Sequence, residues 1–460
     1  MNQMNESLDI EEVVNRQRRY FSGGGTRDLD TRLEALSRVE HYLQGHRQEL
    51  LDCLAEDLGK PAMEAYLAEY HFLLQEIRLI RGSLKSWLRA KKVKSPLYFQ
   101  PCKSRIVYEP LGVTLVVGPW NYPVQLSLSP LLASIAAGNT VVLKPSEVSS
   151  ASETFLLDLV DACFDPGHVS AVAGGPDVAS ALLGQCFDFV FFTGSTSIGR
   201  VVARKAAEHL TPSILELGGK CPAVVDASAD LETAARRILA GKMFNAGQTC
   251  FAPDFVLVHH DVRSELLEWM RRILDEVPWA EEMTRIINRH HYQRIEGYLE
   301  AYQGEVMTSF DDDPETLRLA PRILPDARWE DLVMQEEIFG PVLPVLTYED
   351  ESSLCGCLRD RSSPLALYLF SKDEAWVQRL IAETRSGGVC VNDTMKQGSS
   401  LSLPFGGVGE SGYGRYRGRA GVLALSNQRA VVERPAKGPA WAELMPPYGK
   451  RFEWVKKWLR

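Results

Sequence analysis

The feature that most constrains this chain is a regular alternation of apolar, strand-like runs and helical runs between residues 113 and 210. Strands are predicted at 113–117, 140–143, 169–173 and 187–192, with helices at 126–137, 149–163, 176–183 and 197–210 between and after them. Helices of this length between strands act as right-handed crossovers, so these strands are predicted to form a parallel sheet.

A second α/β series begins near Glu216. Its strands are predicted at 222–225, 255–258, 344–347, 365–370 and 388–392, and two of its helices at 230–244 and 262–277. A chain of 460 residues is too long for one hydrophobic core, so two or three domains are expected. Residues 10–90 carry apolar stripes at helical spacing, which we interpret as core faces without chemistry.

Three further segments lie outside these two series. The stretch from 91 to 108 and the segment 428–433 are both strand-like, and the second is expected to pair outside its own domain, while 399–414 is a glycine-rich loop. The tail from Trp441 combines five basic residues with two tryptophans, at Lys450, Arg451, Lys456, Lys457, Arg460, Trp454 and Trp458. Packing of this tail against the body is favoured over contact with a membrane surface or a partner.

Composition excludes several classes of protein. The net charge of −9 argues against nucleic acid as a partner. No apolar run is long enough to cross a membrane, so no stable membrane insertion is predicted. The polar stretch from Met1 to Asp9 lacks the apolar core of a signal peptide, which favours a cytoplasmic protein.

Cysteine and histidine usage points to reduced thiols and no metal site. The nine cysteines are odd in number and scattered, as expected for free thiols. The pairs His259-His260 and His290-His291 are interpreted as surface imidazoles rather than ligands.

One cysteine stands apart because a polar turn presents it. Cys250 ends the segment Asn245-Ala-Gly-Gln-Thr-Cys250, a poor place for an inert core thiol. We interpret it as a nucleophile. Glu216 ends an apolar strand and is a candidate general base, with a structural ion pair as the alternative. Asn121 is a candidate oxyanion donor, with a helix cap as the alternative.

Two strand ends could hold a dinucleotide. The segment Thr193-Gly-Ser195-Thr-Ser-Ile-Gly199 lies between a strand and a helix, where backbone amides favour a pyrophosphate. It matches neither the Rossmann nor the Walker pattern, and an ordinary strand-to-helix turn explains it about as well. Lys144 and Glu147 follow another strand and could bind ribose hydroxyls, or could form a solvated turn.

Taken together, these motifs resemble the aldehyde dehydrogenase superfamily over nearly the full chain. Trp120-Asn-Tyr-Pro123, Gln335-Glu-Glu337-Ile-Phe339-Gly-Pro341 and Leu403-Pro-Phe-Gly-Gly-Val-Gly409 look most like its class 3 branch, which is dimeric and acts on fatty or aromatic aldehydes. The resemblance implies an α/β fold with three parts: a Rossmann-like NAD(P)-binding domain (1–91 and 109–215), a catalytic domain (216–415) and a β-stranded oligomerisation arm (92–108 and 427–435). The tail would be 436–460.

The resemblance also implies roles. Cys250 would be the nucleophile, Glu216 the base and Asn121 an oxyanion donor. The cofactor would be NAD or NADP, held by Trp120, Lys144, Glu147, Gly194, Ser195, Gly199, Leu217, Gly218, Glu337 and Phe339. Glu147 beside the ribose should repel a 2′-phosphate and favour NAD, although class 3 members often accept both.

The chain departs from the class 3 pattern near its C-terminus. Many members carry Tyr-His-Gly where this chain has Tyr416-Arg417-Gly418, and no histidine follows His291. In the family these positions border the substrate entrance or dimer contacts. The predicted function is oxidation of a medium- or long-chain aliphatic or aromatic aldehyde to its acid by a homodimer. The alternatives are an enzyme that passes the acyl group to coenzyme A, and a non-catalytic binding protein on the same fold.

Overall fold

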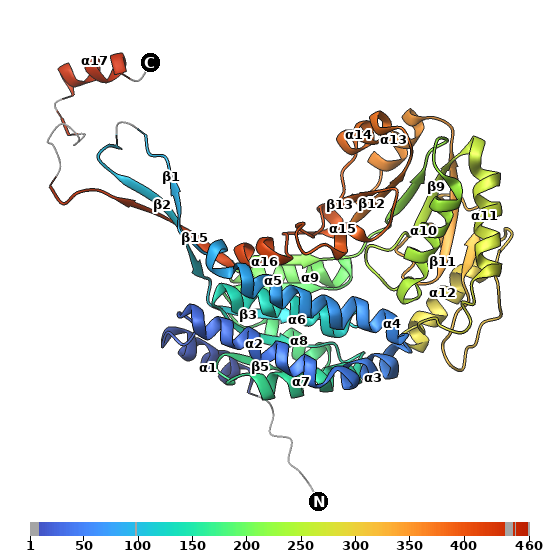
Figure 1. Cartoon of the computed structure of the whole chain (residues 1–460), viewed down its shortest axis with the longest axis horizontal. Helices are drawn as coiled ribbons and strands as arrows, with labels where there is room; N and C mark the ends of the chain where they lie inside the picture. Colours follow the sequence, from blue (N-terminus) through green and yellow to red (C-terminus); the bar gives the residue numbers. More distant parts are fainter. Residues whose placement is uncertain (1–8, 97–98, 438–444, 447, 459–460) are drawn as a thin grey trace, which may run out of the picture.

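The computed structural model describes residues 9–96, 99–437, 445–446 and 448–458. Two sheets form the body and a third forms an arm (Figure 1). The N-terminal helices are α1 (Ile10–Ser22), α2 (Leu29–Gly45), α3 (Arg47–Leu58), α4 (Ala62–Ala65), the π-helix η1 (Tyr66–His71) and α5 (Phe72–Trp87). Their apolar stripes pack on the first sheet and its helices, as predicted.

The first sheet has the order β14-β7-β6-β3-β4-β5. Its strands are β3 (Val113–Val117), β4 (Thr140–Lys144), β5 (Val169–Ala171), β6 (Phe189–Thr193), β7 (Ser213–Glu216) and β14 (Gly412–Tyr413). All pairs are parallel except β14 with β7. The four strands predicted between 113 and 192 are confirmed. The order reverses between β3 and β6, the kind of switch point at which parallel sheets bind ligands.

Helices α6 (Pro123–Ala137), α7 (Ser150–Cys163), α8 (Pro176–Leu183) and α9 (Thr196–Glu208) connect these strands. Every residue of α6 is buried, because this helix lies between the sheet and the helices α2 and α5. The strand register pairs Val117 with Lys144 and Thr193 with Glu216. The loops that follow β3, β4, β6 and β7 therefore leave the sheet at one edge.

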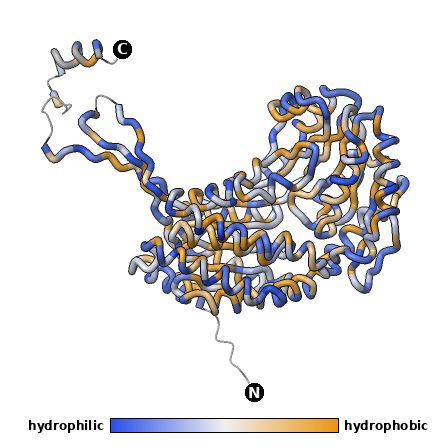
Figure 2. The backbone as a smooth tube through the Cα atoms, viewed as in Figure 1, coloured by the Kyte–Doolittle hydropathy of each residue, from blue (hydrophilic) through white to orange (hydrophobic). Residues whose placement is uncertain are grey.

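The second sheet is fully parallel, in the order β10-β11-β9-β8-β12-β13. Its strands are β8 (Pro222–Val225), β9 (Phe255–His259), β10 (Arg322–Leu324), β11 (Val342–Tyr348), β12 (Ala366–Phe370) and β13 (Gly388–Val391). Its helices are α10 (Leu231–Met243), α11 (Arg263–Glu276), α12 (Arg289–Ala301), α13 (Glu351–Arg359), α14 (Glu374–Glu383) and α15 (Lys396–Ser399). The short β10 was not predicted. Figure 2 shows hydrophobic residues along the inner strands of the body.

One strand from the C-terminal part of the chain returns to the first sheet. Glu216 ends β7, and β14 at 412–413 pairs with β7 in the first sheet. The range 216–415 predicted for the catalytic domain thus overlaps the first sheet at both ends. After this return, α16 (Gly418–Ala424) packs on α5 and α6.

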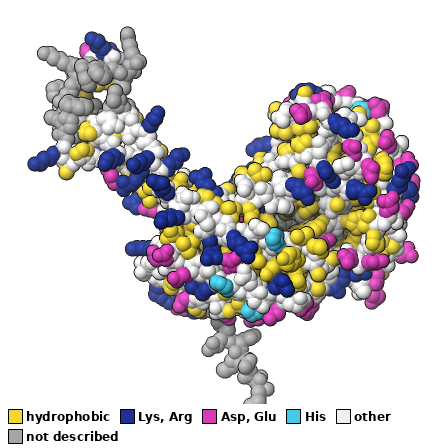
Figure 3. Space-filling model, in the orientation of Figure 1, with side chains coloured by type: hydrophobic (Ala, Val, Ile, Leu, Met, Phe, Trp, Pro, Cys, Tyr) yellow, Lys and Arg dark blue, Asp and Glu magenta, His cyan; other side chains and the backbone are white. Residues whose placement is uncertain are grey.

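The arm is an antiparallel sheet of β1 (Lys91–Val93), β2 (Lys103–Pro110) and β15 (Ser426–Glu433). It projects from the body, and Lys and Arg side chains line it in Figure 3. Ser426 pairs with Pro110 near the body, and Glu433 pairs with Lys103 at the far end. The pairing of the 428–433 segment with a distant strand agrees with the prediction.

The expectation that the tail packs on the body is wrong for its described part. Helix α17 (Gly449–Trp458) lies beyond the tip of the arm (Figure 1). The physical reason is the direction of β15, which carries the chain outward before the tail begins. Trp441 and Arg460, also assigned to this tail, lie outside the described residues. No helix in the described part of the chain is long and apolar enough to span a bilayer.

Candidate active site

Cys250 follows a strained turn at the end of α10. Asn245, Ala246 and Gly247 all adopt left-handed backbone, with φ of 54°, 50° and 73°. This conformation is uncommon for residues that carry a Cβ. The side-chain Nδ2 of Asn245 donates to the carbonyls of Asn121 (3.1 Å) and Gln248 (3.0 Å), which fixes the turn.

Buried polar contacts lock the next two residues. Gln248 is fully buried; its Nε2 donates to the Arg285 carbonyl (2.9 Å), and its Oε1 accepts from the Ile287 amide (3.0 Å). The Thr249 hydroxyl bonds the Tyr122 hydroxyl at 2.6 Å. The loop that carries the thiol is thus joined to the Trp-Asn-Tyr-Pro segment.

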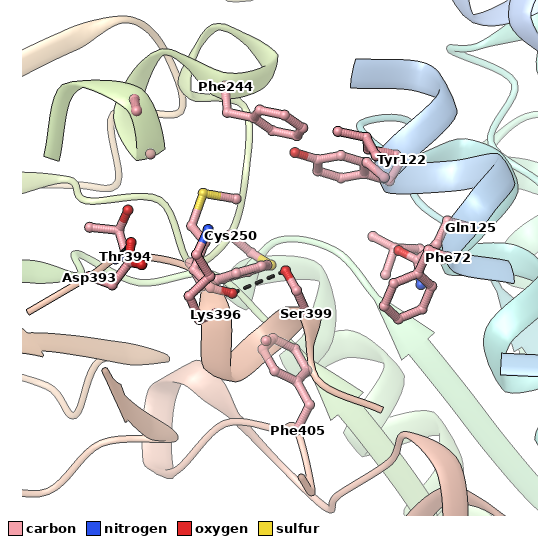
Figure 4. Close-up of a pocket in the computed structure, with 18 of the residues that line it drawn as sticks. Phe72, Tyr122, Gln125, Phe244, Cys250, Asp393, Thr394, Lys396, Ser399 and Phe405 are labelled. Carbon is pink, nitrogen blue, oxygen red and sulfur yellow. Dashed lines mark hydrogen bonds between the residues drawn. The ribbon is translucent and has the colours of Figure 1, made fainter. Parts of the chain in front are cut away.

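The thiol of Cys250 lines a cavity of about 540 Å³. In Figure 4 it lies among Tyr122, Phe244 and Phe405. Burial raises the pKa of Cys250, and the carboxyl groups of Glu337 and Glu216 raise it further. Cys53, Cys163, Cys221 and Cys355 are buried, as expected for inert thiols of the core. Cys250 instead lines a cavity that a ligand can enter.

Glu216 is buried, and it is near enough to Cys250 for its carboxyl to raise the pKa of the thiol. Both carboxyl oxygens are inaccessible and accept no hydrogen bond from the described residues. Burial raises the pKa of Glu216, against the opposing effects of Arg417 and Arg415. The alternative interpretation, an ion pair with a lysine, has no counterpart among the salt bridges of the described residues. Buried carboxyls without partners and with a raised pKa are concentrated at functional sites, which makes Glu216 a candidate site residue.

Asn121 is positioned by a network that reaches back to the N-terminal helices. Its Nδ2 donates to the Gln248 carbonyl at 3.0 Å, and it does not cap α6. Lys60 donates to the Asn121 carbonyl (3.1 Å) and to Glu69 (2.6 Å). The other carboxyl oxygen of Glu69 accepts hydrogen bonds from the backbone amides of Val124 and Gln125, in the first turn of α6. The helix-cap role considered for Asn121 therefore belongs to Glu69.

A second cavity of about 460 Å³ is lined by Gly218, Gly219 and Glu337. A Cβ at Gly218 would overlap the Glu337 carboxyl, so the absence of a side chain is what allows this approach. Burial raises the pKa of Glu337 to about 8, and Asp254 adds to the effect. Arg294 holds this loop through the Ile338 carbonyl (2.7 Å).

Other predicted cofactor residues lie along the same sheet edge. Ser195 caps α9 by accepting from the Ile198 amide (3.4 Å), and the Gly194 amide donates to the Glu216 carbonyl (3.0 Å). Gly199 packs so closely on Leu217 that a Cβ would overlap it. The exposed N-terminus of α9 and this close helix–strand packing suit a dinucleotide pyrophosphate.

The remaining predicted residues form two contacts. Lys144 is buried and forms an ion pair with the partly exposed Glu147. Trp120 packs edge-on against Phe339, with ring centroids 5.3 Å apart. Lys144 and Glu147 touch each other but make no described contact with Cys250, so the site extends along the edge rather than clustering at one point.

Sequence reasoning missed most of the 540 Å³ cavity. Its walls include Leu67, Ala68 and Phe72 from the helical region 10–90, in which the sequence predicts no site residue. Arg417 and Lys396 line it too. The one available signal was the departure from the class 3 pattern around Arg417. The sequence contained no signal for the roles of Lys60 and Glu69, because those roles depend on the burial of both side chains.

Comparison with known proteins decides the family. The aldehyde dehydrogenase family model matches residues 2–431. The chain belongs to the aldehyde dehydrogenase family. It is 37% identical to 4,4′-diaponeurosporen-aldehyde dehydrogenase of Staphylococcus aureus, over 98% of this chain and 99% of that protein. It is 40% identical to aldehyde dehydrogenase family 3 member B1 of Rattus norvegicus, over 96% and 95%.

Solved structures agree with this assignment. The substrate-bound state of Staphylococcus aureus AldH superposes with a TM-score of 0.95 at 36% identity, covering 98% of this chain and 99% of that one. Betaine aldehyde dehydrogenase from Staphylococcus aureus in complex with NAD+ gives 0.85 at 26% identity, covering 94% and 88%. The predicted class 3 resemblance and fold are confirmed. This aldehyde dehydrogenase oxidises aldehydes and uses NAD or NADP.

Proposed function

We propose that Cys250, Glu216 and Asn121 carry out aldehyde oxidation in this enzyme. The observation that supports this most strongly is the position of the Cys250 thiol. It lines the 540 Å³ cavity, and its pKa responds to the buried carboxyls of Glu216 and Glu337. A nucleophile between a cavity for substrate and a buried base is the arrangement that acyl transfer through a thioester requires.

The reaction is the conversion of aldehyde, NAD(P)+ and water into carboxylate, NAD(P)H and two protons. Cys250, as thiolate, attacks the aldehyde carbon and forms a thiohemiacetal oxyanion, which the second Nδ2 hydrogen of Asn121 and the Cys250 amide would stabilise. Bound NAD(P)+ supplies the hydride acceptor. The product on the protein is a Cys250 thioester. Glu216 takes a proton from water, which attacks the thioester carbon and releases the acid and the thiolate.

The dinucleotide fits the residues at the sheet edge. The α9 N-terminus with Gly194, Ser195 and Gly199 would hold the pyrophosphate, and Lys144 with Glu147 the adenosine ribose. Leu217, Gly218, Glu337, Phe339 and Trp120 would form the nicotinamide side. The Glu147 carboxylate favours NAD over NADP.

We further propose that the substrates have apolar or aromatic bodies, since Phe72, Phe244, Phe251 and Phe405 form the cavity walls. The coenzyme A alternative is less well supported, because Glu216 would have no water to activate.

We propose a homodimer in which the arm bridges two subunits, with the exposed edges of β1 and β15 as the contact. The predicted domain ranges stay predictions, with the difference that β14 belongs to the first sheet. The cytoplasmic location also stays a prediction.

The experiment is to replace Cys250 by Ala and to measure NADH formation with a panel of medium-chain and aromatic aldehydes. Turnover should fall by about 10,000-fold or more, while binding of NAD, followed by fluorescence quenching, should persist. Cys186→Ala, at an exposed cysteine, is the matched control and should keep full activity. Turnover that survived Cys250→Ala would refute the proposal.

A further inference from the structure

Arg417 is a buried cation in the wall of the 540 Å³ cavity. The residue is only 4% exposed and lines the same cavity as Cys250. Its backbone has φ of +83°, in the left-handed region that residues with a Cβ rarely adopt. A strained backbone that delivers a charged side chain into a substrate cavity is a feature of functional sites.

The guanidinium is held in place but incompletely paired. It stacks between rings, with its central carbon 4.5 Å from the Phe72 centroid and 4.7 Å from that of Tyr416. Nη1 donates to the Ser129 hydroxyl at 3.2 Å. Nε is buried and has no hydrogen-bond partner in the described part of the chain. Of five N–H donors, the described residues satisfy one.

The neighbouring carboxyl groups do not pair with the remaining N–H donors of Arg417. Glu76 and Glu216 are both buried; burial raises the pKa of each, and the charge of Arg417 offsets only part of that rise. Neither forms a salt bridge with Arg417 among the described residues; Glu76 instead accepts from Ser129. A buried cation without a carboxylate partner is costly, so such a group usually serves a ligand.

The mouth of the cavity has the same sign of charge. Exposed Arg237 and Lys396 line it, and Asp393 is the acidic residue of the lining. Three cations face one anion here, although the whole chain carries a net charge of −9. A local positive field in an acidic protein steers anions toward the site.

We propose, on the basis of the function argued above, that this enzyme prefers aldehydes bearing a carboxylate at the end remote from the aldehyde group. The aromatic walls would hold an apolar or aromatic spacer, and the free donors of Arg417 would bind the carboxylate. A guanidinium matches a carboxylate in geometry and forms charge-assisted hydrogen bonds with it.

The test compares two aldehydes of similar shape, 4-carboxybenzaldehyde and its neutral methyl ester, by kcat/KM. For each enzyme, kcat/KM for the carboxylate is divided by kcat/KM for the ester. The wild-type ratio is then divided by the Arg417→Gln ratio, which cancels the difference in intrinsic reactivity between the two aldehydes. We expect the carboxylate preference to fall by about 10- to 100-fold in the variant. Arg417→Lys should keep part of it, because the charge remains while the planar fork is lost.

Arg379→Gln is the matched control, since Arg379 pairs with Glu351 on the surface and is not among the residues that line this cavity; its ratio should equal that of the wild type. An Arg417→Gln variant that loses activity equally with both aldehydes would overturn the proposal. Wild-type enzyme that oxidises neither aldehyde, nor any of the panel above, would instead count against the proposed function.

A second measurement avoids variants altogether, in case Arg417→Gln does not fold. Terephthalate and its monomethyl ester mimic the two products, and their inhibition constants are compared with wild-type enzyme. We expect terephthalate to bind about 10-fold more tightly or better. Equal inhibition, or weaker inhibition by terephthalate, would overturn the proposal.

Discussion

The 540 Å³ cavity that contains Cys250 and the 460 Å³ cavity that contains Glu337 differ in how they are built. The 460 Å³ cavity is lined largely by short contiguous segments, including 218–220 and 334–337. The 540 Å³ cavity draws Leu67 from η1, Phe244 from the end of α10, Lys396 from α15 and Arg417 from the loop before α16. Both cavities join distant segments, but the 460 Å³ cavity contains residues 218–220 and 335–337 of the sequence motifs, whereas most of the lining of the 540 Å³ cavity belongs to no motif. A dinucleotide imposes the same local requirements in many enzymes, whereas a substrate pocket is defined by whatever the fold brings together.

After Cys250→Ala, the largest expected effect is at Glu216, which lines neither cavity. Replacing Glu216 with Gln should lower steady-state turnover by about 100- to 10,000-fold, because water is no longer activated. The first turnover should still release one equivalent of NADH per active site as the thioester forms. Rapid mixing with absorbance at 340 nm measures this burst.

Glu265→Gln, at an exposed glutamate of α11, is the control for Glu216 and should behave like the wild type. A Glu216→Gln enzyme without a burst would mean that this carboxyl acts earlier, in forming the thiolate, and the assignment as hydrolytic base would be wrong.

Asn121→Ala should have the next largest effect, a fall in kcat of about 100- to 1000-fold through loss of an oxyanion donor. Because Nδ2 also holds the Gln248 carbonyl, the melting temperature is measured in parallel. If kcat fell no further than the loss of folded protein explains, Asn121 would be a structural residue and not an oxyanion donor.

A pair of substitutions separates the two cavities. Gly218→Ala should displace the Glu337 carboxyl and raise KM for NAD by about 10-fold, with little change in KM for the aldehyde. Phe244→Ala should do the reverse, because Phe244 lines only the aldehyde cavity of the two. Both values come from initial rates with one substrate varied. Equal shifts in both constants for either variant would break the distinction between the cavities.

The smallest expected effect is a pH-dependent stability from Glu337. Burial raises the pKa of Glu337 in the folded protein from its ordinary value of 4.5 to about 8, so the folded protein binds the proton more tightly than the unfolded chain. The resulting stability is present at low pH and is lost as pH rises from about 4.5 to about 8.

Glu337→Gln should therefore gain a few degrees of melting temperature relative to the wild type, about 2 °C or more, between pH 5.5 and pH 8.5 without cofactor. Thermal unfolding at both pH values measures it, with Glu265→Gln as control. A constant difference between variant and wild type would show that Glu337 keeps an ordinary pKa.

Much of the fold was predictable because it follows from local rules. Alternating apolar runs and helices between 113 and 210 predicted β3 to β6 and their helices within a few residues. The tail was not predictable, because the direction of β15 decides where it begins. The three-residue β10 was missed because so short a run has no periodicity of its own.

The sequence by itself determined the chemistry of the site: a thiol on a polar turn, a carboxylate and an amide at strand ends, and glycines where a cofactor must approach. Each of these depends on neighbours within a few residues. Only the tertiary structure decided that Lys60 and Glu69 position Asn121, and that Phe72 and Arg417 face Cys250 across a cavity. Those contacts join segments up to 345 residues apart, from Phe72 to Arg417, and the packing of α5, α6 and α16 brings them together.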